Sequence, residues 1–138
     1  MMEAVPQIDP IVSAVPGGPG RVLSFLGSAM IDEVERGWSH IAASCFAAGE
    51  LSHLESRPLQ TAAGFLATKR ALLMLFEATE PRAELSERDF VLTHAENGAP
   101  RLVSVPDAGC YEHLGTAAIR ISISHTKACA YGLACVQE

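Results

Sequence analysis

The pattern of apolar and polar positions along the chain predicts one long buried helix, in residues 59–79. Its apolar residues cover more of the helix surface than a single stripe, so we expect this helix to lie at the centre of the molecule. Lys69 and Arg70 are its polar exceptions, and two adjacent cations in such a helix need an anion or solvent to face. Shorter helices are predicted in residues 32–43, which begin with acidic side chains, and in residues 47–56, which precede a proline.

Strands are predicted on both sides of the helical region, in residues 21–31 and in residues 119–136. Residues 21–31 are apolar and partly β-branched, and Gly27 within them marks a bend or a close approach of two backbones. Residues 119–124 alternate isoleucine with polar side chains, which is the period of a strand. After His125, residues 128–136 return as an apolar strand.

A hairpin is predicted between these ends, in residues 90–94 and 101–105. Asn97 and Gly98 lie between the two runs, and both residue types tolerate the positive φ that tight hairpin turns require. Together with the long helix, these strands predict an α+β fold in which antiparallel strands pack on a long central helix.

The length and composition of the chain narrow its organisation and its partners. Its 138 residues suit a single domain, and prolines and glycines punctuate residues 1–20, so we expect a flexible N-terminal arm followed by one domain in residues 21–138. A formal net charge of −6 argues against a nucleic-acid partner. No apolar stretch approaches the roughly 20 residues of a membrane span. No signal peptide is recognisable, so we expect no membrane partner and a cytoplasmic location.

The cysteines and most histidines show no pattern of a metal site. The four cysteines form no C-x-x-C pair, and we expect them to be free thiols in apolar surroundings. They are Cys45, Cys110, Cys129 and Cys135. Four histidines also lack any spacing that argues for a site: His40, His53, His94 and His113.

Four segments occur in the order and spacing of one known family. Residues 121–126, ISISHT, resemble a family strand that ends in S-x-S-H-[ST]. Residues 96–100, ENGAP, resemble its G-x-P turn, and residues 65–71, FLATKRA, stand where the family has R-F-A-x-K-E-A. Residues 45–51, CFAAGEL, look like its F-T-x-x-E-L helix start. Over residues 22–136 the chain thus resembles the small phosphopantetheinyl transferases of the holo-acyl-carrier-protein-synthase type.

This resemblance implies transfer of 4′-phosphopantetheine from coenzyme A to a serine of an acyl carrier protein. The transition state gathers negative charge on phosphate oxygens, so it needs a metal ion and cationic side chains. The family holds magnesium between the Asp of a G-x-D motif on its first strand and the Glu of K-E-A. By resemblance, Lys69 contacts the phosphates, Ser122, Ser124 and His125 lie against the nucleotide, and Lys69 and His125 are the catalytic candidates.

Both metal positions depart from the family pattern. The best fit to G-x-D places Ala29 at the metal Asp, and Arg70 stands at the metal Glu, so no metal ligand is assigned. A slipped alignment would instead place Asp32 at the first position. Without these carboxylates, magnesium would keep only phosphate and water ligands. Arg70 beside Lys69 could nevertheless hold the pyrophosphate of coenzyme A, because a guanidinium matches phosphate oxygens bidentately.

Each of these residues also has a purely structural interpretation. Lys69 could reach the surface along the buried helix with its charged end in water. Arg70 could form an ion pair, with Glu77 or with an acidic residue of another subunit. Asp32 and Glu33 could simply complement a helix N-terminus.

The sequence leaves three hypotheses of function open. Two of them follow from the resemblance, and in the third the chain is a small α+β domain with an unrelated ligand. The first is a catalytically degenerate protein with the transferase fold, acting as a binding or partner subunit in a carrier-protein system of fatty acid or polyketide biosynthesis. Its partners would be an acyl carrier protein or a related transferase subunit, in a homo- or hetero-oligomer, since family members of this size resemble trimers with active sites between subunits. The alternative is an active holo-acyl-carrier-protein synthase with a remodelled metal site.

Overall fold

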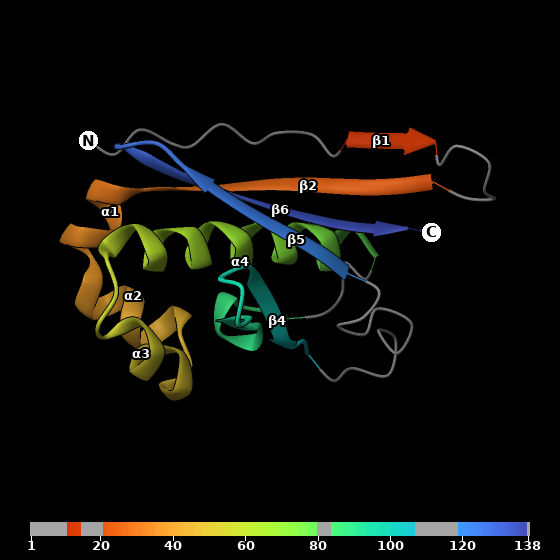
Figure 1. Ribbon diagram of the computed structural model, residues 1–138. Coiled ribbons are helices and arrows are strands. Elements are labelled where there is room, and N and C mark those ends of the chain that lie inside the picture. The colour runs from red at the N-terminus through yellow and green to blue at the C-terminus, as the bar shows by residue number, and fades with distance from the viewer. Residues whose placement is uncertain (1–10, 15–20, 80–83, 107–118, 138) are drawn as a thin grey trace.

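The computed structural model describes residues 11–14, 21–79, 84–106 and 119–137, which form the helices and strands of Figure 1. In chain order these are β1 (Ile11–Ala14), β2 (Arg21–Met30), α1 (Ile31–Arg36), α2 (Trp38–Cys45), α3 (Ala48–Leu54), α4 (Leu59–Thr79), the 3-10 turn η1 (Glu87–Asp89), β3 (Val91–His94), β4 (Pro100–Ser104), β5 (Ile119–His125) and β6 (Cys129–Gln137). All described strand pairs are antiparallel. The predicted α+β class is therefore confirmed.

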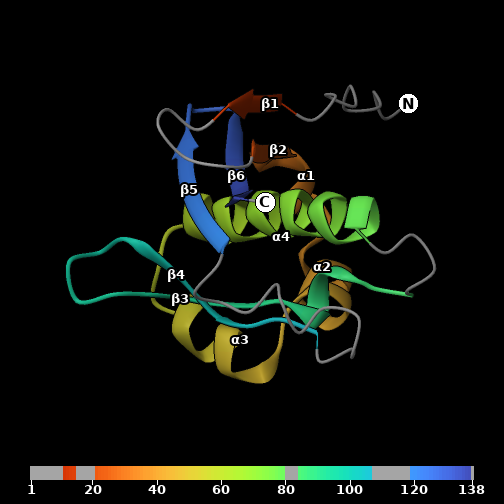
Figure 2. The same cartoon turned by 90° about the vertical axis from the view of Figure 1, so that its right-hand side faces the viewer.

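The central helix α4 lies between two layers. One layer is a four-stranded sheet in the order β1-β2-β6-β5. The other layer, on the opposite side of α4, contains α2, α3 and the β3–β4 hairpin (Figures 1 and 2). Because α4 is covered from both sides, its apolar residues need more than one stripe. Its largest buried apolar side chains are Phe65, Leu66, Leu72, Leu75 and Phe76.

The sheet approaches α4 closely because two glycines face the helix. A Cβ atom at Gly27 of β2 would lie 2.1 Å from the carbonyl oxygen of Ala67 and 2.7 Å from the backbone nitrogen of Ala71. A Cβ atom at Gly132 of β6 would lie 2.3 Å from the backbone nitrogen of Thr68. Gly27 and Gly132 are direct partners in the sheet, so they form one contact patch against the middle of α4. The predicted close approach at Gly27 is confirmed.

The helix predicted in residues 32–43 is two helices in the structure. Helix α1 ends at Gly37, whose N–H donates to the carbonyl oxygen of Glu33 at 3.0 Å, and α2 begins directly afterwards. Glycine has a low helix propensity, which favours a break at this position. The periodicity of the segment did not show this break.

Strand β1 lies inside residues 1–20, where no strand was predicted. It pairs with β2, from Ile11 opposite Ser24 to Ala14 opposite Arg21. The other residues of the predicted N-terminal arm lie outside the described residues. This part of the arm therefore extends the sheet by one strand.

The predicted hairpin is confirmed as β3 and β4. The N–H of Gly98 donates to the carbonyl oxygen of Ala95, and the N–H of Ala95 donates to that of Ala99. Gly98 has φ = 84°, which is the left-handed conformation that the turn requires of a glycine. The side chain of Asn97 closes the turn by accepting from the N–H of Ala99 at 3.0 Å.

Two further sequence expectations concern thiols and membranes. Cys45, Cys129 and Cys135 are free thiols, as expected, and Cys110 lies outside the described residues. Among the described helices, none is both long and apolar enough to cross a bilayer. Neither result bears on the location of the protein.

Candidate functional site

Arg70 lies on the side of α4 that faces the sheet and α1. Its Nη1 donates to the carbonyl oxygen of Ser28 in β2 at 2.8 Å. Its Nη2 forms a hydrogen-bonded ion pair with the carboxylate of Glu33 in α1. The side chains of Arg70 and Glu33 are 31% and 28% exposed, so solvent reaches the pair. The predicted structural ion pair therefore exists, but its partner is Glu33 and not Glu77.

The two positions predicted to replace the metal ligands lie on facing elements. Ala29 follows Ser28 on β2, and Arg70 contacts the Ser28 carbonyl from α4. Ala29 is fully buried and offers a methyl group. Glu33 is the carboxylate that contacts Arg70, and it is already neutralised by the guanidinium.

These residues do not fit a magnesium ion. Magnesium requires oxygen ligands in near-octahedral geometry, usually including one or two carboxylates. No group of three or more His, Cys, Asp or Glu in the described part of the chain could hold a metal ion. A guanidinium at the centre of the site would also repel a divalent cation.

Asp32, the ligand of the slipped alignment, points toward solvent. Its carboxylate pairs with Arg36 one turn later in α1, at 3.1 Å. The side chains of Arg36 and Asp32 are 81% and 63% exposed. The pair is a surface interaction within one helix, so the structure gives the slipped alignment no support.

Lys69, the predicted phosphate contact, is buried on the other side of α4. Its Nζ donates to Oε1 of Glu50 at 2.6 Å, to the carbonyl oxygen of Phe90 at 2.5 Å and to that of Glu87 at 3.3 Å. It also lies 4.9 Å from the centre of the Phe46 ring. An ammonium group has three donors, and all three have acceptors here. Burial lowers the pKa of Lys69, and the adjoining Glu50 carboxylate opposes that shift.

Glu50 is the residue that makes this burial possible, and the sequence analysis missed its role. It is 1% exposed, and its carboxylate accepts from Lys69 and from the N–H groups of Ala47 and Leu92, both at 2.9 Å. Glu50 thereby joins the start of α3, strand β3 and helix α4. Glu50 is the Glu of the segment that resembles F-T-x-x-E-L, and this match was the one feature of the sequence that singled it out.

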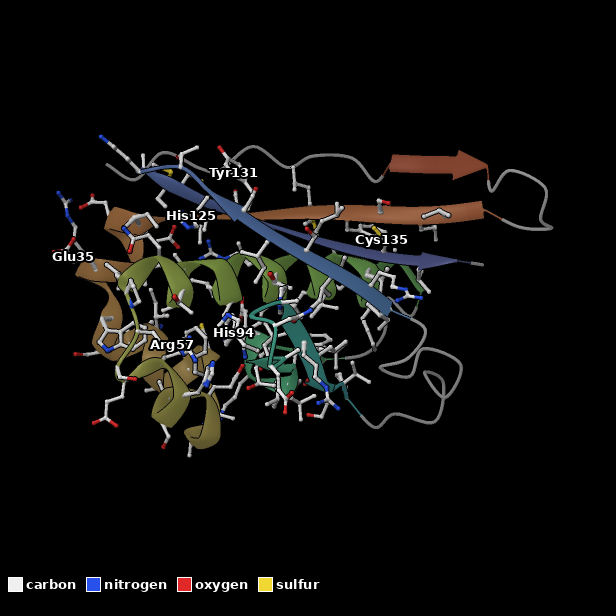
Figure 3. All side chains as sticks on the ribbon, in the orientation of Figure 1. Glu35, Arg57, His94, His125, Tyr131 and Cys135 are labelled. Carbon is white, nitrogen blue, oxygen red and sulfur yellow. The ribbon has the colours of Figure 1, made fainter. Side chains whose placement is uncertain are left out.

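The three predicted nucleotide contacts on β5 do not share one face. Ser122 and Ser124 are exposed and alternate with Ile121 and Ile123, which turn toward α4. His125 continues the isoleucine series and is exposed at the end of the strand. In Figure 3, His125 lies above α4, whereas His94 and Arg57 lie below it. The structure therefore separates Ser122 and Ser124 from His125, and all three from Lys69.

Two histidines that showed no pattern in the sequence meet below α4. His53 of α3 and His94 at the end of β3 are joined by a hydrogen bond of 2.7 Å between Nε2 and Nδ1. Both rings pack on Phe65, with centroids 6.1 Å and 5.1 Å from its ring. Burial and the charge of Arg57 lower the pKa of both histidines, and His53 contributes to the shift of His94.

The lowered pKa values predict that acid destabilises the protein through this pair. The unfolded chain binds protons on His53 and His94 near their ordinary pKa of about 6.5, whereas the folded chain resists them. Their stabilising contribution is thus complete above that pH and is lost as the pH falls below it. We expect the urea midpoint to fall more between about pH 7 and pH 5 in the wild type than in His53→Gln/His94→Gln.

His40→Gln is the matched control for this experiment, because His40 is exposed on α2. It should keep the pH dependence of the wild type. An equal acid sensitivity of the double variant and the wild type would contradict the assignment.

Comparisons with known proteins identify the fold. No protein-family model matches the sequence, and a search of curated proteins finds no significant relative. Solved structures do match. The holo-(acyl-carrier-protein) synthase of Bacillus anthracis str. Ames, in complex with CoA (3′,5′-ADP), superposes with a TM-score of 0.63 at 16% identity, over 83% of this chain and 95% of that one.

Two further structures of this kind agree. The Helicobacter pylori holo-[acyl-carrier-protein] synthase in complex with coenzyme A has a TM-score of 0.61 at 18% identity, over 83% of this chain and 99% of that one. The Mycobacterium tuberculosis acyl carrier protein synthase has a TM-score of 0.61 at 19% identity, over 83% and 95%. The chain therefore has the holo-acyl-carrier-protein-synthase fold, the α+β fold that its sequence motifs resemble.

Proposed function

We propose that this protein is a catalytically degenerate member of the phosphopantetheinyl transferase fold, acting as a binding or partner subunit in a carrier-protein system of fatty acid or polyketide biosynthesis. One observation carries the proposal. Arg70, which the motif match sets at the family's metal Glu, is paired with Glu33 and contacts β2 beside Ala29, the residue matched to the metal Asp.

The charge arrangement supports this proposal. Phosphoryl-type transfer needs strong positive charge that is free to meet the phosphate oxygens of the transition state. Here the guanidinium of Arg70 is already partly neutralised by Glu33, and the ammonium of Lys69 is 0% exposed. Among the described residues, Lys69 is thus buried and Arg70 shares its charge with Glu33, and this arrangement supports a binding role over transfer.

Coenzyme A is the small ligand that we propose, with an acyl carrier protein or a related transferase subunit as the partner. Two structures with this fold are coenzyme A complexes. In this chain, Arg70 would meet the pyrophosphate and the exposed His125 the nucleotide, whereas Ser122 and Ser124 are exposed on the other face of β5. We assign no magnesium to the complex.

We also propose that the protein forms an oligomer, with itself or with a transferase subunit, in the cytoplasm. The face of the four-stranded sheet opposite α4 carries large apolar side chains that are not fully covered. Met30 is 41% exposed and Tyr131 is 37% exposed. Leu26 and Leu133, which pair across β2 and β6, are half-buried on the same face. Burying such a face against another chain would be favourable.

An active transferase with a remodelled site is the second candidate, and Glu33 is the observation that favours it. Glu33, in the first turn of α1, places a carboxylate beside Arg70. Were Arg70 to move away on substrate binding, Glu33 would remain as one carboxylate near the phosphates.

Intact-mass spectrometry separates the two candidates. We expect no carrier protein to gain a phosphopantetheine group when the protein is incubated with coenzyme A, magnesium and apo carrier proteins from its own genome. An active holo-acyl-carrier-protein synthase must modify the same carriers in parallel. Native mass spectra of the same mixtures should show a complex with coenzyme A, a carrier protein or the active synthase.

A mass gain that disappears in Glu33→Gln would establish the active candidate and overturn our proposal. The absence of any complex in the native spectra would contradict the binding role.

A further inference from the structure

We infer that Glu33 is an internal competitor for an anionic ligand at Arg70, and that this ligand is a phosphate or pyrophosphate group bound without a divalent metal ion. The inference rests on the proposed function for the class of ligand. It adds a specific residue, Glu33, which neither the sequence motifs nor the fold assigns to binding.

Two contacts with β2 fix the position of the Arg70 guanidinium. The Cβ of Arg70 would be 3.1 Å from a Cβ at Gly27, so the side chain leaves α4 at its closest approach to β2. The Ser28 carbonyl then fixes Nη1 at 2.8 Å. A cation with a fixed orientation loses less conformational entropy when it binds a ligand.

Donors remain for a ligand on the solvent side of this group. A guanidinium has five N–H donors, and the contacts with Ser28 and Glu33 account for two of them. With 31% of the Arg70 side chain exposed, an anion from solution can approach the pair. Phosphate oxygens match the fork of a guanidinium bidentately, which a single carboxylate oxygen does not.

Glu33 occupies one arm of that fork and repels a second anion. Partly exposed ion pairs are weak, because solvent and salt screen them. An incoming phosphate would therefore have to displace the carboxylate or tolerate it at close range. Either way, Glu33 lowers the affinity of Arg70 for anions, and removal of its charge should raise that affinity.

The same contacts argue against a divalent metal ion beside Arg70. Arg70 already supplies a fixed positive charge between β2 and α1, and Ala29 offers no ligand. A divalent ion placed there would meet a guanidinium before it met a free carboxylate. The phosphate group would be neutralised by the side chain and not by a bridging ion.

Isothermal titration calorimetry with inorganic pyrophosphate in EDTA tests this directly. We expect Glu33→Gln to bind about tenfold more tightly than the wild type, since both the ion pair and the repulsion are removed. The matched control is Asp32→Asn, which removes a neighbouring charge that pairs with Arg36, and we expect a change below about twofold. Arg70→Gln should lose at least about tenfold, and Arg70→Lys, which keeps the charge, should lose less.

Thermal melts of each variant report folding separately from binding. Repeating the titrations with phosphate and coenzyme A separates a general anion site from one that needs the whole ligand. Equal affinities of Glu33→Gln and Asp32→Asn would overturn the competitor role, as would wild-type binding that requires magnesium. Failure of every variant to bind pyrophosphate would also overturn it, and carrier-protein complexes in the native mass spectra would then still support the proposed function.

Discussion

Lys69→Met is expected to destabilise the protein by about 3–5 kcal/mol, since it leaves the carboxylate of Glu50 buried without its cation. Both side chains are 0% exposed, and Nζ of Lys69 lies 2.6 Å from Oε1 of Glu50. The substitution also removes the donor to the carbonyl oxygens of Phe90 and Glu87. Buried acceptors without a donor cost further free energy.

Urea unfolding followed by tryptophan fluorescence measures this effect. Trp38 is the single tryptophan, and its ring centroid lies 5.9 Å from that of Phe46, which packs beneath the Lys69 ammonium. Lys127→Met is the matched control, because Lys127 is exposed, and it should change the free energy of unfolding by less than about 0.5 kcal/mol.

A double variant then tests whether the pair itself is responsible. Lys69→Met/Glu50→Gln removes both charges and keeps one acceptor oxygen, which can serve the N–H of either Ala47 or Leu92 but not both. It should be more stable than Lys69→Met, because no uncompensated charge stays buried, but less stable than the wild type, because one N–H loses its acceptor. A single variant as stable as the wild type would show that Lys69 is not bound in the core.

This result affects how activity measurements are interpreted. Loss of an activity in a Lys69 variant would follow from unfolding and would not identify a catalytic lysine. Arg70 is the better probe of ligand binding, because its head group is partly exposed and its partner Glu33 can be changed independently.

The sequence predicted those parts of the fold that have a local signal. Helix α4 was recognisable from an apolar surface wider than one stripe, and the β3–β4 hairpin from Asn97 and Gly98. The alternation in β5 located the last hairpin. At Gly27, a glycine in an apolar strand correctly indicated a close approach of two backbones.

The site was less predictable, because its contacts join residues far apart in the chain. Lys69 and Glu50 are 19 residues apart, and His53 and His94 are 41 apart, so no periodicity connects either pair. Family motifs gave both Lys69 and Glu50, but not that they bind each other. The sequence indicated that Arg70 needs an anion or solvent to face. Its partner Glu33 could be identified only from the structure, in which the turn from β2 into α1 places Glu33 beside α4.

Gly132→Ala and Gly27→Ala are expected to destabilise the protein by about 3 kcal/mol or more each, because the new methyl group would overlap backbone atoms of α4. At Gly132 the Cβ would lie 2.3 Å from the nitrogen and 2.4 Å from the Cα of Thr68, and at Gly27 it would lie 2.1 Å from the Ala67 carbonyl oxygen. Backbone atoms cannot rotate away as a flexible side chain can, so the sheet and the helix must separate.

Gly49→Ala provides the matched control, and its effect should have the opposite sign. Gly49 lies in helix α3, and a Cβ there meets no atom within 4 Å. Alanine has the higher helix propensity, so Gly49→Ala should stabilise the protein by up to about 1 kcal/mol. Urea unfolding of the three variants measures all these values. Because the close contact also sets where Arg70 leaves α4, Gly27→Ala should weaken pyrophosphate binding as well as folding, whereas Gly49→Ala should leave binding unchanged.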